Sequence, residues 1–226
     1  MIEPRRPVVR IRRPIKEGAA LRPAPRLRIG LLGGSFNPAH EAHMAVSLEA
    51  LKRLDLDRVW WLVSPQNPLK PTGETADLEE RLACARAIAG RHPRIVVTDL
   101  ERRLGTRYTV DTLAWLKKRC RARFVWLIGS DNLAQLPLWR GWRRLVRMAP
   151  IAVFDREPYS YVALAGRMAS AYAEERLEEA RAAALAESPP PAWVYLRLRR
   201  HQASSTAIRR EEAAAPRRNR RKEERS

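Results

Sequence analysis

The sequence predicts an α/β protein whose single domain is built on a Rossmann-like, doubly wound parallel sheet. Short apolar runs alternate with longer segments of helical period between residues 27 and 198, which is the pattern of a parallel sheet covered by helices. One run, residues 124–128, is apolar throughout, as a central strand buried on both faces should be. A chain of 226 residues can also bury a substantial core. Right-handed crossovers predict the strand order 3-2-1-4-5, with a sixth strand beside it.

Three elements open the predicted fold: a strand at 27–32, a helix at about 39–54 and a strand at 58–63. The first strand ends where Gly33 and Gly34 allow a tight turn. We expect Asn37 to cap the helix and Pro38 to occupy its first position. Helical spacing predicts that the helix faces the sheet with Met44, Leu48 and Leu51.

The alternation continues along the chain. Further strands are expected at 94–99, 123–129, 151–154 and 193–198, and further helices at 77–89, from about 109, and at 161–186. Thr109 is expected to cap the second of these helices. The segment 161–186 is rich in Ala, Glu and Arg and predicts one long helix with a charged outer face. The inward residues of these helices are expected to be Leu78, Leu82, Ala85, Ile88, Leu113 and Leu116.

The net charge of +19 is concentrated at the two ends of the chain. Residues 1–26 carry a net charge of +6 and five prolines, and residues 209–226 carry +4. Segments so rich in Arg, Pro and Glu cannot bury enough apolar surface to fold. We therefore expect a disordered basic leader at 1–26, one domain at 27–212 and a basic tail at 213–226. Contact of the tails with nucleic acid is the less favoured alternative, and a start site chosen too far upstream would give the same leader.

Cysteine content and hydropathy predict a cytoplasmic protein without membrane contact. Cys84 and Cys120 lack the spacing of metal ligands and are compatible with a reducing compartment. No apolar run reaches the roughly 20 residues that a membrane span requires, and the N-terminus lacks the apolar centre of a signal peptide. The sequence does not indicate an oligomeric state.

The chemistry of the chain is concentrated in residues 29–43, which read IGLLGGSFNPAHEAH. Gly33 and Gly34 can bring bare backbone close to a ligand, and the helix that follows offers free amides and a dipole to an anion. His40 and His43 lie three residues apart and can donate further hydrogen bonds. Together these features predict a polyphosphate site. The stretch matches neither a dinucleotide fingerprint nor a Walker loop, and zinc would need ligands besides the two histidines.

The pattern Gly-Gly-Ser-Phe-Asn-Pro-x-His-x-x-His resembles the signature of the nucleotidyltransferase superfamily, in the form found in nicotinate-nucleotide adenylyltransferases. A second motif of the family is present near the C-terminus as Ser-Ser-Thr-Ala-Ile-Arg, residues 204–209. The resemblance covers residues 27–212 and implies the nucleotidyltransferase variant of the predicted fold. The chain departs from the family at Ala42, where a glycine is usual, and the extra methyl would matter if backbone there passes close to a phosphate.

The resemblance also implies the site residues. As catalytic residues it implies His40, His43 and Arg209, and as further contacts with ATP it implies Gly33, Gly34, Ser35, Phe36, Gly129, Asp131, Ser205 and Thr206. For nicotinate mononucleotide it implies Asn37, Lys70, Tyr108, Thr109, Trp139 and Arg140. Simple helix capping is the alternative for Asp131 and for one of the C-terminal hydroxyls. Trp142, three residues beyond Trp139, is expected to pack in the core.

The implied reaction is adenylyl transfer from ATP to nicotinate mononucleotide, which gives deamido-NAD and pyrophosphate. The acceptor phosphate is mostly dianionic at neutral pH, with a second pKa near ~6, and needs no general base. Mg²⁺ is expected to arrive on the ATP phosphates, without a metal site of the protein's own. Two alternatives remain open: another transferase of the superfamily, such as pantetheine-phosphate adenylyltransferase or glycerol-phosphate cytidylyltransferase, and a basic nucleic-acid-binding protein on this fold.

Overall fold

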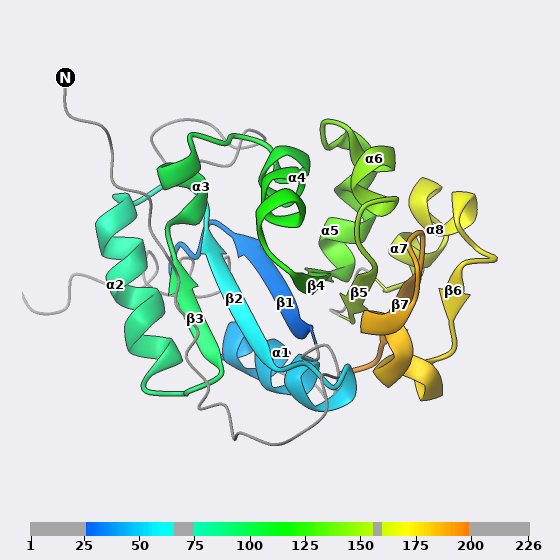
Figure 1. Ribbon diagram of the computed structural model, residues 1–226, viewed down its shortest axis with the longest axis horizontal. Coiled ribbons are helices and arrows are strands. Elements are labelled where there is room, and N and C mark those ends of the chain that lie inside the picture. Colours follow the sequence, from blue (N-terminus) through cyan, green and yellow to red (C-terminus); the bar gives the residue numbers. More distant parts are fainter. Residues whose placement is uncertain (1–25, 66–74, 156–159, 199–226) are drawn as a thin grey trace, which may run out of the picture.

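The computed structural model describes residues 26–65, 75–155 and 160–198. They form one parallel sheet with the strand order β3-β2-β1-β4-β5-β7-β6 (Figure 1). The strands are β1 (Leu27–Gly34), β2 (Arg58–Val63), β3 (Ile95–Thr98), β4 (Ala122–Gly129), β5 (Ile151–Phe154), β6 (Arg176–Leu177) and β7 (Trp193–Leu196). The predicted fold class and the order 3-2-1-4-5 are confirmed. The predicted sixth strand is β7, and the two-residue β6 at the sheet edge was not expected.

Helices cover both faces of the sheet. They are α1 (Glu41–Arg53), α2 (Leu78–Ala89), α3 (Leu100–Leu104), α4 (Thr109–Arg119), α5 (Ser130–Gln135), α6 (Trp142–Val146), α7 (Ser160–Leu164) and α8 (Arg167–Ala171), with 3-10 segments η1 (Leu136–Leu138) and η2 (Glu179–Glu187). One apolar core lies between the sheet and α1, α2 and η2, and a second lies between the sheet and α4, α5, α6 and α8. Among the described residues no helix is long and apolar enough to cross a membrane.

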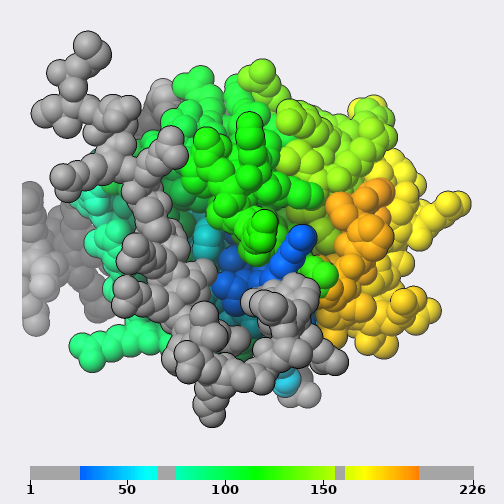
Figure 2. Space-filling view, in the orientation of Figure 1, coloured from blue at the N-terminus to red at the C-terminus, as the bar shows by residue number. Residues whose placement is uncertain are grey.

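The two layers are visible in the figures. In Figure 1, α4, α5 and α6 lie above the sheet and α1 lies below it. In the space-filling view (Figure 2), the green α4–α6 region and the orange β7 region flank a small blue area from the start of the described chain. β1 lies inside the sheet, because the strand pairs with β2 on one side and β4 on the other.

The strand register brings three strand ends to one edge of the sheet. Gly34 at the end of β1 pairs with Val63 at the end of β2. On the other side Leu32 pairs with Leu127, two residues before each strand ends, so Gly34 and Gly129 lie level. Strand order reverses between β1 and β4, and ligands of open α/β sheets bind beyond the carboxyl ends of the strands at such a reversal. The predicted glycine loop therefore lies at the expected binding edge.

The long helix predicted for residues 161–186 is wrong. The segment forms α7, α8, β6 and η2 instead, although Ala and Glu favour a continuous helix. Tertiary contacts override this preference. The Tyr172 carbonyl accepts a hydrogen bond from the Trp193 indole N–H at 2.6 Å, and the Tyr172 ring packs edge-on against Trp142. The chain then lies along the sheet edge, where Arg176 and Leu177 pair with β7.

The start of α1 also differs from the prediction. His40, and not Asn37, is its N-cap, and Pro38 precedes the helix. The Asn37 side chain instead accepts a hydrogen bond from the Ala76 amide at 3.2 Å, just before α2. Of the residues predicted to face the sheet, Leu51 is buried and Met44 packs against the core, whereas Leu48 is 42% exposed and Val46 and Ala50 are buried instead. The predicted cap of α4 is likewise shifted, since Tyr108 is the N-cap and Thr109 is the first helical residue.

Candidate active site

The loop after β1 is held in a strained conformation. Phe36 has a φ of 47°, in the left-handed region that a residue with a bulky side chain rarely adopts. Its ring is buried, stacked on Trp61 at 5.2 Å and tilted against His43 at 4.6 Å between centroids. Strain of this kind persists only where the surroundings enforce it, and it clusters at functional sites.

The two glycines of the loop have different roles. A Cβ atom on Gly33 would lie 2.9 Å from the ring of Trp126, so packing within the protein requires glycine there. A Cβ atom on Gly34 would make only an ordinary 3.5 Å contact with the Phe36 ring. Close approach of a ligand is therefore the better reason for glycine at position 34 than at position 33.

The paired histidines meet at the start of α1, as their spacing predicts. Their ring centroids are 4.0 Å apart, and the His40 amide donates to His43 Nδ1 at 3.2 Å. A neutral His43 ring that accepts at Nδ1 carries its proton on Nε2, which makes Nε2 the donor atom of the ring. His40 is buried and His43 is half-buried. The structure thus brings together the histidines and the loop residues Gly34 to Asn37.

Two further hydrogen bonds fix this first turn to the sheet. The Trp61 indole N–H donates to Ser47 Oγ at 2.7 Å, and the Ser47 hydroxyl donates to the His43 carbonyl at 2.7 Å. Both side chains are fully buried. A buried relay of this kind restricts the position of His43 more than packing alone would.

Ala42 occupies the second helical position of α1 and is buried in the core. Among the described residues, only Phe36 and Asp55 have a positive φ without being glycine. The methyl group of Ala42 therefore requires no unusual backbone conformation.

The end of β4 supplies the predicted Gly-x-Asp segment. Gly129 is the N-cap of α5, and Asp131 lies in the first turn of that helix. Asp131 is consequently not the N-cap residue of α5. Ser130 between them is fully buried.

Four of the six residues predicted to face nicotinate mononucleotide come from two segments of the described chain, around Tyr108 and around Trp139. The Arg140 guanidinium lies 4.7 Å above the Tyr108 ring centroid, and Thr109 is adjacent at the start of α4. Trp139 is half-buried against the core around α4 to α6. Gly141 follows with a φ of 66°, a conformation that suits glycine, and Trp142 packs in the core as predicted. Trp139 and Tyr108 therefore belong to one surface region.

A buried residue that the sequence did not suggest connects the loops at this edge. Arg81 of α2 is 3% exposed and donates four hydrogen bonds to backbone carbonyl oxygens. Burial lowers the pKa of its guanidinium, and the neighbouring Asp77 carboxylate partly offsets this. One signal could have found it: Arg81 falls between Leu78, Leu82 and Ala85 on the inward stripe of the predicted helix.

A buried carboxyl group lies beside the same loops. Glu101 of α3 is 7% exposed, and Thr112 donates to its Oε1 at 3.4 Å. Burial raises the pKa of the Glu101 carboxyl above its usual value, although hydrogen bonds from Ser64 and Thr112 partly oppose the shift. Nothing in the sequence distinguished Glu101 from a surface glutamate. It connects the loop after β2, through Ser64, with the Tyr108 segment, through Thr112.

Glu101→Gln is expected to raise Tm by about 2–4 °C at pH ~9 and to change it little near pH ~5. The raised pKa means that the folded chain keeps a proton that the unfolded chain loses near 4.5. Stability therefore falls as pH rises from that value through the folded pKa, and glutamine removes the effect. Melting curves across this range are the measurement. Glu80→Gln, on the exposed face of α2, is the control, and parallel profiles for Glu101→Gln and wild type would contradict the prediction.

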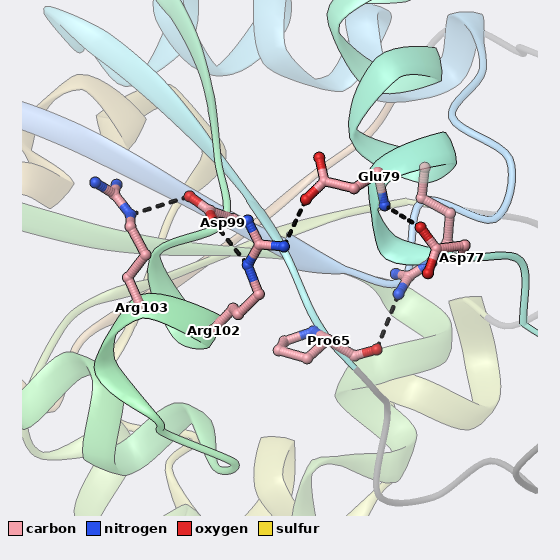
Figure 3. A network of polar contacts seen from close by, with 7 residues as sticks. Pro65, Asp77, Glu79, Asp99, Arg102 and Arg103 are labelled. Carbon is pink, nitrogen blue, oxygen red and sulfur yellow. Dashed lines mark hydrogen bonds and ion pairs between the residues drawn. The ribbon is translucent and has the colours of Figure 1, made fainter.

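Exposed ion pairs hold α2 and α3 together next to this cluster. Arg102 bridges Asp99 at 2.6 Å and Glu79 at 2.5 Å, and Arg103 pairs with Asp99 at 3.0 Å (Figure 3). Burial tends to raise the pKa of Asp99, but the hydrogen bond from Arg102 and the charge of Arg103 keep it below its usual value.

Part of the predicted site lies outside the described residues. These positions are Lys70, Ser205, Thr206 and Arg209, together with the rest of the motif at 204–209. In the described part of the chain, no group of three or more His, Cys, Asp or Glu side chains could hold a metal ion.

Comparisons with known proteins agree with this geometry. The family model described as cytidylyltransferase-like matches residues 31–211. A probable nicotinate-nucleotide adenylyltransferase from Bradyrhizobium sp. (strain ORS 278) is 56% identical over 171 residues, which cover 75% of this chain and 88% of that protein. A protein of the same description from Methylorubrum extorquens (strain PA1) is 52% identical over 75% of this chain and 92% of its own length.

Solved structures show the same fold at much lower identity. Plasmodium falciparum nicotinic acid mononucleotide adenylyltransferase, solved in complex with NaAD, superposes with a TM-score of 0.60. The two chains are 16% identical, and the match covers 82% of this chain and 83% of the other. At this identity the likeness supports the fold alone.

Proposed function

The chain belongs to the nicotinate-nucleotide adenylyltransferases, a group within the cytidylyltransferase-like family, and from this premise we propose how its residues serve the reaction. The enzyme transfers the adenylyl group of ATP to nicotinate mononucleotide, forming deamido-NAD and pyrophosphate in NAD biosynthesis. The observation that carries this function is 56% identity across 88% of a relative described by that activity. The meeting of the histidine pair and the glycine loop at the strand-order reversal supports it.

ATP binds, in this proposal, across the ends of β1 and β4. Gly34 leaves room for the phosphates, and His40 and His43 donate to their oxygens from the start of α1. Asp131 at the end of β4 accepts from ribose hydroxyls. Gly33, Ser35 and Phe36 shape the loop, and Gly129, Ser205, Thr206 and Arg209 complete the proposed ATP contacts. Arginine suits phosphate because its planar fork can donate two parallel hydrogen bonds.

Nicotinate mononucleotide binds on the α4–α6 side of the same edge. Trp139 offers a flat face to the pyridine ring, and Arg140, held over Tyr108, supplies a positive charge for the nicotinate carboxylate. Asn37, Lys70 and Thr109 complete the proposed set. Asn37 has a second role in the described structure, because its side chain also anchors the start of α2.

Catalysis in this proposal consists of alignment and charge stabilisation. The phosphate of nicotinate mononucleotide attacks the α-phosphorus of ATP, and the bond to the departing pyrophosphate breaks. No proton has to be removed from the attacking oxygen, so no general base is needed. Donors such as His43 Nε2 stabilise the charge that builds on the phosphate oxygens.

Mg²⁺ is proposed to enter as part of the MgATP substrate, held by phosphate oxygens and water. The family match at 31–211 supports a nucleotidyltransferase domain at 27–212 with basic segments on either side. We further propose that the enzyme acts in the cytoplasm.

The assay that tests this function measures pyrophosphate release and dinucleotide formation with MgATP and a set of acceptors. Nicotinate mononucleotide should give deamido-NAD, whereas phosphopantetheine, and glycerol phosphate with CTP, should give no product above background. Excess EDTA should stop turnover and excess Mg²⁺ should restore it. Without the cation, the negative charge of the ATP triphosphate is not neutralised, and ATP binds and reacts poorly. Turnover with phosphopantetheine alone would refute the proposal, and full activity in EDTA would refute the role of the cation.

A further inference from the structure

Arg81 is a buried cation whose hydrogen bonds within the described part of the chain all go to backbone carbonyl oxygens. Its Nε donates to the Ala76 carbonyl at 2.9 Å, and its Nη2 donates to the Pro65 carbonyl at 2.9 Å. Its Nη1 donates to the carbonyls of Ser35 and Ser64, each at 2.7 Å. Four of the five N–H bonds of the guanidinium are thus used, and each engages the main chain of a loop.

These carbonyls belong to three separate segments at the binding edge. Ser35 lies in the glycine loop after β1, Ser64 and Pro65 follow β2, and Ala76 precedes α2. Figure 3 shows the Pro65 carbonyl pointing toward the start of α2, where Asp77 lies. One rigid guanidinium therefore fixes the positions of three loops relative to one another.

The bond to Ser35 acts on the strained residue of the site. The Ser35 carbonyl belongs to the peptide unit that leads into Phe36, whose φ of 47° is unfavourable. Holding that carbonyl restricts the rotation of this peptide unit. Because the Phe36 ring rests on His43, the restraint extends to the catalytic pair.

Ser64 is fixed from two sides. Its amide donates to the Gly34 carbonyl at 2.9 Å, and its carbonyl accepts from Arg81. Its side chain hydrogen-bonds Glu101, which Thr112 also contacts from α4. The carbonyl bonds of Arg81 therefore form part of a buried connection from the ATP side of the site to the Tyr108 segment.

We propose that Arg81 is a positioning residue for adenylyl transfer, which acts through the carbonyls of Ser35, Ser64, Pro65 and Ala76. The proposal rests on the function given above, because its consequence is the alignment of the two substrates. Displacements of about 1 Å can lower the rate of such a reaction by about 10²-fold. Only arginine fits this role, since a lysine ammonium presents its three donors from a single atom and cannot span three loops.

The test compares Arg81→Lys and Arg81→Met with wild type in kcat, KM and Tm. Arg81→Lys retains the charge and should lower kcat roughly tenfold, with the larger decrease in Arg81→Met. KM for nicotinate mononucleotide should change less than kcat, because Arg81 reaches the Tyr108 segment indirectly, through Ser64, Glu101 and Thr112. If Arg81 were purely structural, its substitution would lower Tm but would not lower kcat selectively over KM.

Two variants of the same helix serve as controls. Leu82→Ala removes a fully buried neighbour and should lower Tm while sparing kcat at temperatures where the protein is folded. Arg86→Lys changes an exposed arginine of α2 and should alter neither quantity. Amide hydrogen exchange at Ser64 provides a readout without substrate, and its rate should rise at least about tenfold in Arg81→Lys but not in Arg86→Lys.

Wild-type kcat in Arg81→Lys would overturn the proposal, as would an equal loss of kcat in a Leu82→Ala variant of the same Tm. If wild-type protein makes no deamido-NAD, the proposed function fails by itself. In that case unchanged exchange at Ser64 in Arg81→Lys would also remove Arg81 as the residue that positions the loops. Faster exchange would retain that role for whichever reaction the site performs.

Discussion

His43→Ala is expected to lower kcat by about 10²–10³-fold, with a much smaller change in KM for nicotinate mononucleotide. The reason is the position of the ring at the start of α1, where the His40 amide occupies Nδ1 and leaves Nε2 as the donor. Charge on the phosphate oxygens builds as pyrophosphate departs, so a donor placed there contributes most in the transition state. Alanine removes the donor and also the acceptor of the His40 amide, so Tm is measured beside kcat to separate the two effects.

His40 requires a different substitution, because it is also the buried N-cap of α1. His40→Asn retains a good capping residue and removes the imidazole, so it should preserve Tm and still lower kcat by about 10²-fold. His92→Ala, at a half-buried histidine just before β3, is the control and should leave kcat unchanged. Near-wild-type kcat in both site variants, with Tm preserved, would show that the histidines do not act on the phosphates.

Much of the sheet was predictable because buried strands are marked by their composition. The predicted and observed limits of β2 coincide, since the apolar run at residues 59–63 follows Arg58 and is followed directly by Ser64 and Pro65. The helices were less predictable. In α1 Leu48 was expected to face the sheet but is exposed, whereas Met44 packs against the core as expected and the small Ala50 is fully buried beside it. Local propensity alone could not indicate that Tyr172 and Trp193 interrupt the segment at 161–186.

The site was predictable where a short motif contains its parts. The turn, the two histidines and the helix start are contiguous in the sequence, so their proximity followed from local structure. The packing of Arg140 on Tyr108 joins residues 32 positions apart, and the family resemblance assigned both to one site without predicting their contact. Arg81 and Glu101 were missed because isolated charged residues are usually exposed. Only the tertiary structure shows that loop carbonyl oxygens accept hydrogen bonds from Arg81 and that the hydroxyl groups of Ser64 and Thr112 hydrogen-bond Glu101.

Acceptor recognition can be tested separately from catalysis at Trp139. Trp139→Ala is expected to raise KM for nicotinate mononucleotide by about ten- to a hundredfold, because stacking of a base on an aromatic ring contributes ~1–3 kcal/mol. KM for ATP should change little, since the proposed ATP contacts lie at the glycine loop and the end of β4. Trp139→Phe keeps an aromatic face and should recover most of the loss. Trp115→Ala, at another half-buried tryptophan packed on the same core, is the control.

The same experiment tests selectivity for the acid over the amide. The nicotinate carboxylate carries a charge that nicotinamide lacks, and the Arg140 guanidinium is held beside the proposed pocket by its contact with Tyr108. Wild-type enzyme should therefore have the higher kcat/KM for nicotinate mononucleotide, and Arg140→Met should reduce the ratio of the two values by about tenfold or more. Equal use of both nucleotides by wild type would remove Arg140 from recognition. An unchanged KM in Trp139→Ala would place the pyridine ring elsewhere and leave Trp139 as a packing residue of the η1 turn.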